Sequence, residues 1–128
     1  AQLAISSRTE LQGARLAGPR GWLRTGAIQA TGAELVPHIP SLAYRFGLVA
    51  AGRVDAAFAS PNAHDWDLAA TDLLVHEAGG RLIGLDGTVP CYNQDIPRHG
   101  VLASANDRLL PSLLSAVRDA AGEIQHGR

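Results

Sequence analysis

The sequence predicts a layered α/β domain built around a mixed β-sheet. Short apolar runs of strand length alternate with longer segments whose apolar residues recur every three or four positions. Glycine and proline separate most of these segments. The chain has 128 residues, of which 46% are hydrophobic, and this is enough for one domain with its own core over residues 1–128.

The first third of the chain predicts two strands with an irregular segment between them. Residues 2–6 (QLAIS) alternate apolar and polar side chains, which is typical of a strand. Glycine and proline interrupt residues 9–32, so we expect a loop with short helical pieces there. Residues 34–39 (ELVPHI) are predicted to form a short strand. Because proline cannot donate a ladder hydrogen bond, Pro37 either restricts this strand to a sheet edge or bends it.

A helix and a strand follow. Residues 41–52 have apolar side chains at helical spacing, Ser41 is a suitable N-cap, and Gly52 is a suitable stop. Residues 54–59 (VDAAFA) are predicted to form a strand. Arg45 lies within the predicted helix. Its side chain could lie on a solvated face of that helix or contact a phosphate group, and we favour the solvated face.

Residues 66–78 predict the next helix, which begins near two acids, Asp65 and Asp67, and ends at a pair of glycines. An acid at a helix start can cap free backbone N–H groups and suits the positive end of the helix dipole. It could also hold a hard cation beside a phosphate. From the residues alone the capping role is favoured, and the cation site stays an alternative.

The chain ends with two strands and a helix. Residues 81–85 (RLIGL) are predicted as a strand, with 82–85 as its core, residues 91–98 as a loop, and residues 100–105 as a further strand. Asn106 or Asp107 caps a last helix over 109–121, and residues 122–128 are expected to fray. The order is therefore strand, strand, helix, strand, helix, strand, strand, helix.

Composition excludes several kinds of partner and site. The net charge of −1 gives no case for a nucleic-acid polymer or an anionic membrane surface. No apolar run is long enough to span a bilayer. A single cysteine, Cys91, excludes internal disulfides and thiolate metal clusters, and it fits the cytoplasmic location that we expect. His64 and His76 are too far apart to share zinc, and His76 is expected on a solvated helix face beside Asp72.

The segment WDLAATDLLVHEAGG resembles the C-terminal signature of the inositol monophosphatase family, the Mg²⁺-dependent, lithium-sensitive phosphatases. Residues 41–58 and the LASAND segment near the C-terminus are also similar to that family. In appearance the chain is most similar to bacterial members described as bisphosphate nucleotidase-like. The residues that fit the signature are Trp66, Asp67, Ala69, Ala70, Leu73, Leu74, Val75, Glu77, Ala78, Gly79 and Gly80.

The resemblance implies the C-terminal half of the inositol monophosphatase-like fold and a partial active site. Asp67 would be a ligand of the catalytic Mg²⁺ cluster, and the turn with Ser41 and Leu42 would contact phosphate or sugar. Ser60, beside Ala59, stands near the place where inositol monophosphatases carry a substrate-binding Glu. The family's Asp-Pro-x-Asp-Gly-Thr motif is absent, and we expect it before Ala1. No catalytic set is therefore complete in this chain.

The resemblance also implies a function for the intact parent protein, which would hydrolyse a small phosphate ester and form a homodimer. We expect 3'-phosphoadenosine 5'-phosphate or a related nucleotide to compete with inositol monophosphate as substrate. The isolated chain is expected to be inactive and to bind Mg²⁺ weakly. The alternative is a non-catalytic binding or assembly domain derived from the same fold.

Overall fold

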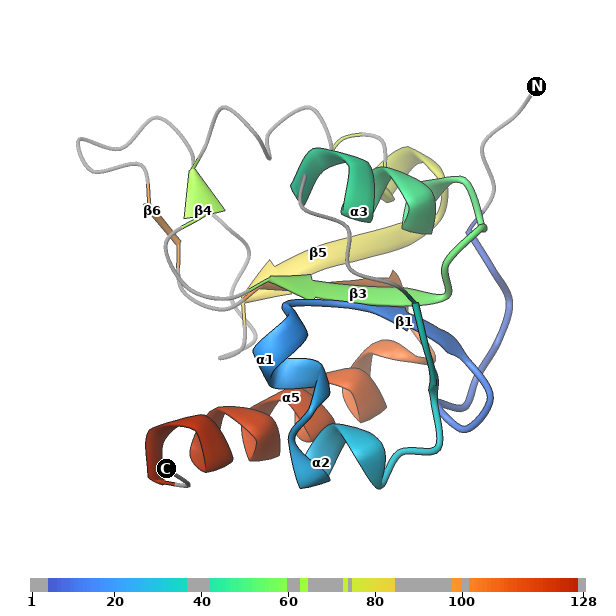
Figure 1. The fold of residues 1–128 in the computed structure, drawn as a ribbon. Coiled ribbons are helices and arrows are strands. Elements are labelled where there is room, and N and C mark those ends of the chain that lie inside the picture. The colour runs from blue at the N-terminus through green and yellow to red at the C-terminus, as the bar shows by residue number, and fades with distance from the viewer. Residues whose placement is uncertain are drawn as a thin grey trace.

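A computed structural model describes residues 5–36, 42–59, 63–64, 73, 75–84, 98–99 and 102–126. Within these ranges one sheet has five strands in the order β2-β1-β3-β7-β5 (Figure 1). Its strands are β1 (Arg15–Ala17), β2 (Glu34–Leu35), β3 (Ala56–Ala59), β5 (Gly80–Gly84) and β7 (Leu102–Asn106). A separate two-stranded ladder joins β4 (Ala63–His64) to β6 (Arg98–His99).

The sheet is mixed, as the sequence predicts. Strand β1 pairs in parallel with β2 on one side and with β3 on the other, with Leu16 opposite Ala56. Strand β7 runs antiparallel to both β3 and β5, and Ala103 lies opposite Phe58 and Ile83. The direction of β7 is therefore opposite to that of the other four strands in this sheet.

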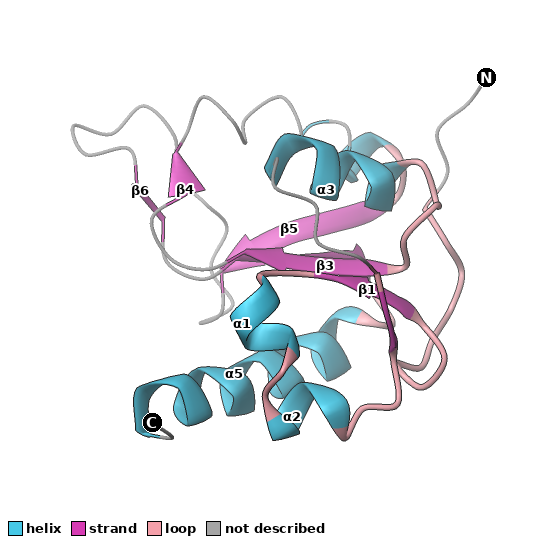
Figure 2. Cartoon of the chain, in the orientation of Figure 1, coloured by secondary structure: helices cyan, strands magenta, loops and turns pink. Residues whose placement is uncertain are grey.

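Helices cover both faces of the sheet (Figures 1 and 2). Helices α1 (Arg20–Leu23), α2 (Gly26–Gln29) and α5 (Leu110–His126) lie on one face. Helix α3 (Leu42–Ala50) lies on the other. None of the helices in the described ranges is long and apolar enough to cross a membrane.

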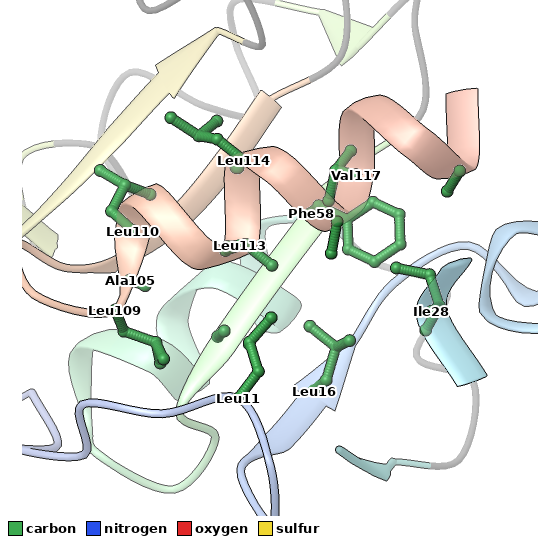
Figure 3. Close-up of a cluster of buried hydrophobic side chains, with 14 of the residues drawn as sticks. Leu11, Leu16, Ile28, Phe58, Ala105, Leu109, Leu110, Leu113, Leu114 and Val117 are labelled. Carbon is green, nitrogen blue, oxygen red and sulfur yellow. The ribbon is translucent and has the colours of Figure 1, made fainter. Parts of the chain in front are cut away.

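Two hydrophobic clusters hold these layers together. The first joins the sheet to α5 and α2, and Figure 3 shows Phe58 of β3 facing the apolar side of α5. Burial of this side of α5 is expected from its sequence, because leucine and valine recur there every three or four residues. The second cluster packs α3 and Val75 onto the opposite face. The buried residues of α5 that the sequence predicts are Leu110, Leu113, Leu114 and Val117.

Most predicted elements are confirmed where they can be tested. Strand β2 lies at the sheet edge, α3 covers most of the predicted helix, and Asn106 caps the last helix by accepting the N–H of Leu109 at 2.8 Å. Leu73 and residues 75–77 are helical, whereas Ala78 lies in a turn. The rest of the predicted 66–78 helix and most of the predicted 91–98 loop lie outside the described residues.

Three predictions about secondary structure are wrong. Ile5 and Ser6 are not in a strand, because their backbone groups bind Ala78 and the side chain of Asn106 instead of a ladder partner. Strand β1 forms within the predicted loop, where three residues are too few to give a periodic signal. The last helix does not fray after residue 121 but continues to His126, and Glu123 in its final turns binds the start of α2.

Candidate functional site

The residues proposed for the site from sequence lie largely outside the described ranges. Asp67, Ser41 and Ser60 are outside them, as is Asp65. Leu42 is the first residue of α3, although its side chain is not described. The surrounding elements can still be placed, because α3 and β3 adjoin these residues in the chain.

The described strands that precede the two predicted substrate-binding segments end at one edge of the sheet. Strand β2 ends at Leu35 and leads to α3, while β3 ends at Ala59, immediately before Ser60. Because β2, β1 and β3 are parallel, their carboxyl ends lie at the same edge. The connection from β1 to β2 passes through α1 and α2 on one face, and the connection from β2 to β3 passes through α3 on the other (Figure 1).

This arrangement is a topological switch point. In open α/β sheets, ligands bind outside the carboxyl ends of the strands, where successive connections leave on opposite faces. The order β2-β1-β3 places that point between β1 and β3. The geometry therefore favours a ligand site at the edge where Ala17 and Ala59 end their strands.

Arg45 approaches this edge from α3, and the prediction that it lies on a solvated face is wrong. The residue is only 3% exposed. One terminal nitrogen of its guanidinium, Nη1, donates a hydrogen bond to the Phe58 carbonyl oxygen at 3.0 Å. Burial lowers the pKa of the Arg45 guanidinium from its usual value. Arg45 lies three residues after Leu42 and four before Val49, so helical spacing places it beside the apolar face of α3. The usual preference of a charged side chain for water favoured the wrong interpretation.

Phe58 is held from both faces of the sheet. Its carbonyl binds Arg45 on the α3 side, whereas its ring packs in the cluster on the α5 side (Figure 3). The ring lies 6.0 Å from that of Trp22, centroid to centroid, and it fills the space that a side chain on Gly18 would need. The last residues of β3 are therefore fixed by packing on the α5 face of the sheet and by a hydrogen bond on the α3 face.

The glycine pair of the signature ends the helical segment at residues 75–77. Gly79 has a φ of +103°, which a residue with a side chain rarely adopts. A Cβ on Gly80 would overlap Ile5 and would lie 3.1 Å from the carbonyl oxygen of Ala105. These glycines allow the chain to turn sharply into β5, and Val75 anchors the helical segment in the second cluster.

A hollow lined by described residues lies at the opposite, amino edge of the parallel strands. It has a volume of about 670 Å³, and Arg15, Glu34 and Asp55 line it at or just before the starts of β1, β2 and β3. It therefore does not coincide with the switch-point edge. The candidate site is the switch-point edge, because the strands that precede Leu42 and Ser60 end there.

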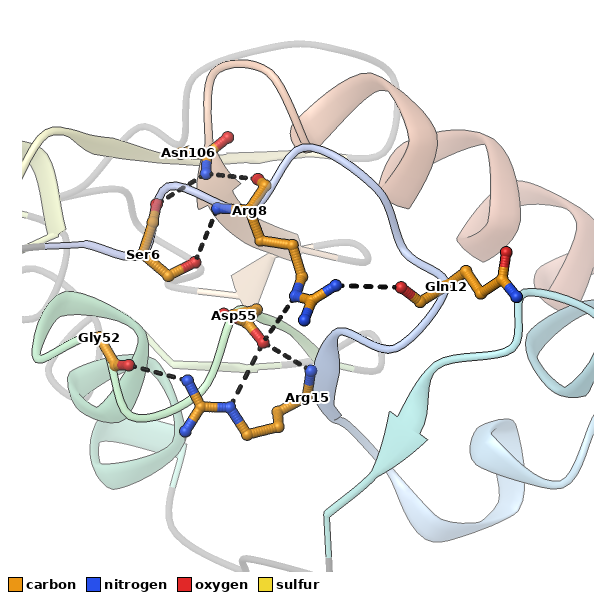
Figure 4. A network of polar contacts seen from close by, with 7 residues as sticks. All are labelled: Ser6, Arg8, Gln12, Arg15, Gly52, Asp55 and Asn106. Atoms are coloured by element: carbon orange, nitrogen blue, oxygen red, sulfur yellow. Dashed lines mark hydrogen bonds and ion pairs between the residues drawn. The ribbon is translucent and has the colours of Figure 1, made fainter.

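Asp55 is the centre of a polar network beside this hollow (Figure 4). Its Oδ2 accepts the Arg15 backbone N–H at 2.7 Å and faces the Nε atoms of Arg15 at 3.4 Å and Arg8 at 3.8 Å. Burial by itself would raise the pKa of Asp55, but hydrogen bonds from Arg15 and Ser6 and the charge of Arg15 lower it overall. Sequence reasoning missed this network, although an acid just before a buried strand was a possible signal.

The described residues do not by themselves form a metal site. Within the described ranges, no three His, Cys, Asp or Glu side chains are placed to hold a metal ion. His76 is exposed on the helical segment, as predicted, whereas its expected partner Asp72 lies outside the described ranges.

Comparison with known proteins identifies the relatives of this chain. The sequence model of the inositol monophosphatase family matches residues 8–121. The chain belongs to this family. A Thermotoga maritima protein described as an IMPase has the same fold, with a TM-score of 0.80 and 20% sequence identity over 97% of this chain and 48% of that chain.

Two curated relatives are phosphatases by name. Histidinol-phosphatase from Mycobacterium tuberculosis is 42% identical over 110 residues, covering 79% of this chain and 41% of the relative. Inositol-1-monophosphatase from Mesorhizobium japonicum is 36% identical over 83 residues, covering 65% of this chain and 29% of the relative. This member of the inositol monophosphatase family therefore spans less than half the length of the curated relatives that it matches.

Proposed function

We propose that this chain is the C-terminal domain of a phosphatase that hydrolyses small phosphate monoesters. The observation that carries the proposal is the parallel β2-β1-β3 arrangement, because the strands that precede both predicted substrate-binding segments end at the carboxyl edge of the sheet. Membership of the inositol monophosphatase family and the phosphatase names of the two curated relatives support it. A preceding portion of the protein would supply the Asp-Pro-x-Asp-Gly-Thr motif.

The start of α3 suits a phosphate group. Its first turn carries no acidic residue, and the first N–H groups of a helix have no partner within the helix. Such N–H groups, at the positive end of the helix dipole, favour anionic ligands. Ser41 and Leu42 at this end would therefore contact the phosphate or its alcohol, and Ser60 would contact the substrate from the end of β3.

Asp67 is the proposed metal ligand of this chain. Carboxylate oxygens are preferred ligands of Mg²⁺, but protein sites usually combine them with water and substrate phosphate. Within the described ranges no three His, Cys, Asp or Glu side chains form a metal site, so Asp67 would need ligands from the preceding portion of the protein, from water and from the substrate. Mg²⁺ dependence, a cytoplasmic location and a homodimeric parent are parts of this proposal.

We propose histidinol phosphate as the first substrate to test. The relative named histidinol-phosphatase is 42% identical to this chain, which supports that choice. Ala59 and Ser60 occupy the region of the inositol-recognising Glu, and this departure argues against inositol phosphate. The nucleotide 3'-phosphoadenosine 5'-phosphate stays the second candidate, on the sequence likeness to bisphosphate nucleotidase-like members.

The test is phosphate release by the full-length parent protein with each of the three phosphate esters, with Mg²⁺ and with EDTA. We expect Mg²⁺-dependent hydrolysis, with the highest kcat/KM for histidinol phosphate. A higher kcat/KM for inositol phosphate would contradict the substrate assignment alone. An absence of turnover on all three esters, for a folded protein with Mg²⁺, would favour the alternative of a non-catalytic binding or assembly domain.

A further inference from the structure

Arg45 is an unusual residue for its position in the fold. It is the fourth residue of α3 and is 3% exposed, while Phe46 and Val49 on the same helix are fully buried. Burying a charged group is unfavourable unless hydrogen bonds compensate for the lost hydration. The presence of arginine therefore calls for a role beyond packing.

The hydrogen bond of Arg45 connects the two elements that border the proposed site. Its guanidinium donates to the Phe58 carbonyl oxygen at 3.0 Å. Phe58 is the last residue but one of β3, and Ser60 follows the end of that strand. Arg45 itself is three residues after Leu42, at the start of α3. A carbonyl oxygen has two lone pairs, so Phe58 can accept this bond in addition to a ladder bond.

We propose that Arg45 is a positioning residue, whose guanidinium holds the end of β3 against the first turn of α3. This inference rests on the proposed phosphatase function, because the substrate contacts expected from Leu42 and Ser60 come from these two elements. Hydrogen bonds that involve a charged group are shorter and stronger than neutral ones. Arg45 thus keeps the two substrate-binding segments at a fixed separation.

The decisive variant is Arg45→Met in the full-length parent protein, with Arg45→Lys as the conservative change. The matched control is Arg53→Met, because Arg53 is exposed and its loss changes the net charge equally. We would measure kcat and KM with histidinol phosphate and with p-nitrophenyl phosphate, after thermal melts have given the folded fraction. Unfolding of some molecules lowers the apparent kcat but leaves KM unchanged.

We expect Arg45→Met to raise KM roughly tenfold, which is the scale of one lost hydrogen bond to a charged group. Arg45→Lys should recover most of this loss, and Arg53→Met should leave KM unchanged. A folded Arg45→Met variant with an unchanged KM would overturn the proposal. If Arg45→Met does not fold, Arg45→Gln and Arg45→Lys decide it: a raised KM for Arg45→Gln supports the proposal, and an unchanged KM in both overturns it.

Hydrogen exchange on the same variants separates this inference from the proposed function. Loss of the Arg45 bond should speed amide exchange in peptides that cover residues 56–60, while peptides within α5, over residues 113–121, stay protected. If the wild-type protein hydrolyses no phosphate ester, the proposed function fails and the exchange measurement alone decides the role of Arg45. In that case faster exchange at residues 56–60 supports the proposal that Arg45 positions the end of β3, and unchanged exchange overturns it.

Discussion

The side chain of Ile5 fills the space that a side chain at position 80 would need. A Cβ on Gly80 would overlap the Cδ1 of Ile5, and it would also lie 3.3 Å from Cγ1 of Val75. The Ile5 N–H donates to the carbonyl oxygen of Ala78 at 3.2 Å. The segment before β1 therefore packs against the turn that joins the helical segment at residues 75–77 to β5. The glycine pair of the signature thus has a packing role in addition to ending a helix.

Gly80→Ala should destabilise the domain. The added methyl group meets Ile5 and the main chain of Ala105, which cannot move without disturbing the pairing of β5 with β7. Overpacking of this kind costs about 1–3 kcal/mol of unfolding free energy. Urea denaturation followed by circular dichroism would measure the loss.

Gly122→Ala is the matched control for that experiment. A Cβ at Gly122 in α5 would have no heavy atom within 4 Å outside its own neighbourhood in the helix. Alanine in a helix interior is more favourable than glycine by about 0.5–1 kcal/mol. Gly122→Ala should therefore raise the urea midpoint. Equal midpoints for Gly80→Ala and the wild type would refute the packing role of Gly80.

Asp55→Asn should lower stability by about 2 kcal/mol, the scale of hydrogen bonds to a charged group. The carboxylate side chain is only 5% exposed, and its Oδ2 atom binds the backbone N–H of Arg15 and pairs with two guanidiniums. Asparagine keeps the shape but removes the charge. The control is Asp107→Asn: its pair with Arg81, at 3.0 Å, is solvent-exposed, so the loss should stay below about 1 kcal/mol. Equal losses of unfolding free energy in the two variants would show that the Asp55 network stabilises the fold no more than an exposed ion pair.

The same carboxylate predicts an acid-dependent loss of stability. The pKa of Asp55 is lower in the folded protein than its ordinary value, so the unfolded chain takes up the proton more readily. The stabilisation is complete above an unfolded pKa of about 4 and is lost as the pH falls through the lower folded pKa. Unfolding free energy measured between about pH 5 and pH 2 should therefore fall more steeply for the wild type than for Asp55→Asn. Parallel curves would show that Asp55 does not contribute.

Local patterns predicted the fold class and most long elements, because each such element repeats its signal over several residues. Helix α5 has a clear apolar period, and Asn106 is a recognisable cap. Strand β1 has three residues, and its pairing partners at Glu34 and Ala56 are remote in the chain. Tertiary pairing, which no local period encodes, decides whether such a short segment becomes a strand.

The candidate site was less predictable than the fold, because the burial of its charged residues depends on tertiary packing. The family resemblance pointed to Asp67, Ser41, Leu42 and Ser60, whose roles stay predictions. The burial of Arg45 and the network around Asp55 depend on which elements meet across the sheet. Charged residues in a helix or before a strand are usually solvated, so their sequence pattern favours the wrong interpretation when packing buries them.

Glu123→Ala should loosen the contact between α5 and α2. The Glu123 carboxylate accepts the backbone N–H groups of Gly26 at 2.8 Å and Ala27 at 2.6 Å, which are the first residues of α2. Loss of such a cap costs about 1 kcal/mol. A thermal melt should show a lower Tm, and Asp119→Ala on the same helix, which makes no comparable contact with α2 in the described structure, should change it less. A similar Tm for both variants would argue against the cap.

Residues 1–128 alone should not hydrolyse phosphate monoesters and should bind Mg²⁺ only weakly. Mg²⁺ requires about six oxygen ligands and gives up its water reluctantly, so one or two carboxylates hold it poorly without further ligands. The sequence offers Asp67 and Asp65 as candidate ligands, and no three metal-ligating side chains come together in the described ranges. In the full-length parent, Asp67→Asn should reduce kcat/KM by on the order of 100-fold, the scale of a misplaced reacting group. Phosphate release and Mg²⁺ titration calorimetry on the chain, the parent and the variant test this. Turnover by residues 1–128 comparable to that of the parent would show that hydrolysis does not need the Asp-Pro-x-Asp-Gly-Thr motif. An Asp67→Asn parent with unchanged kcat/KM would show that Asp67 is not part of the site.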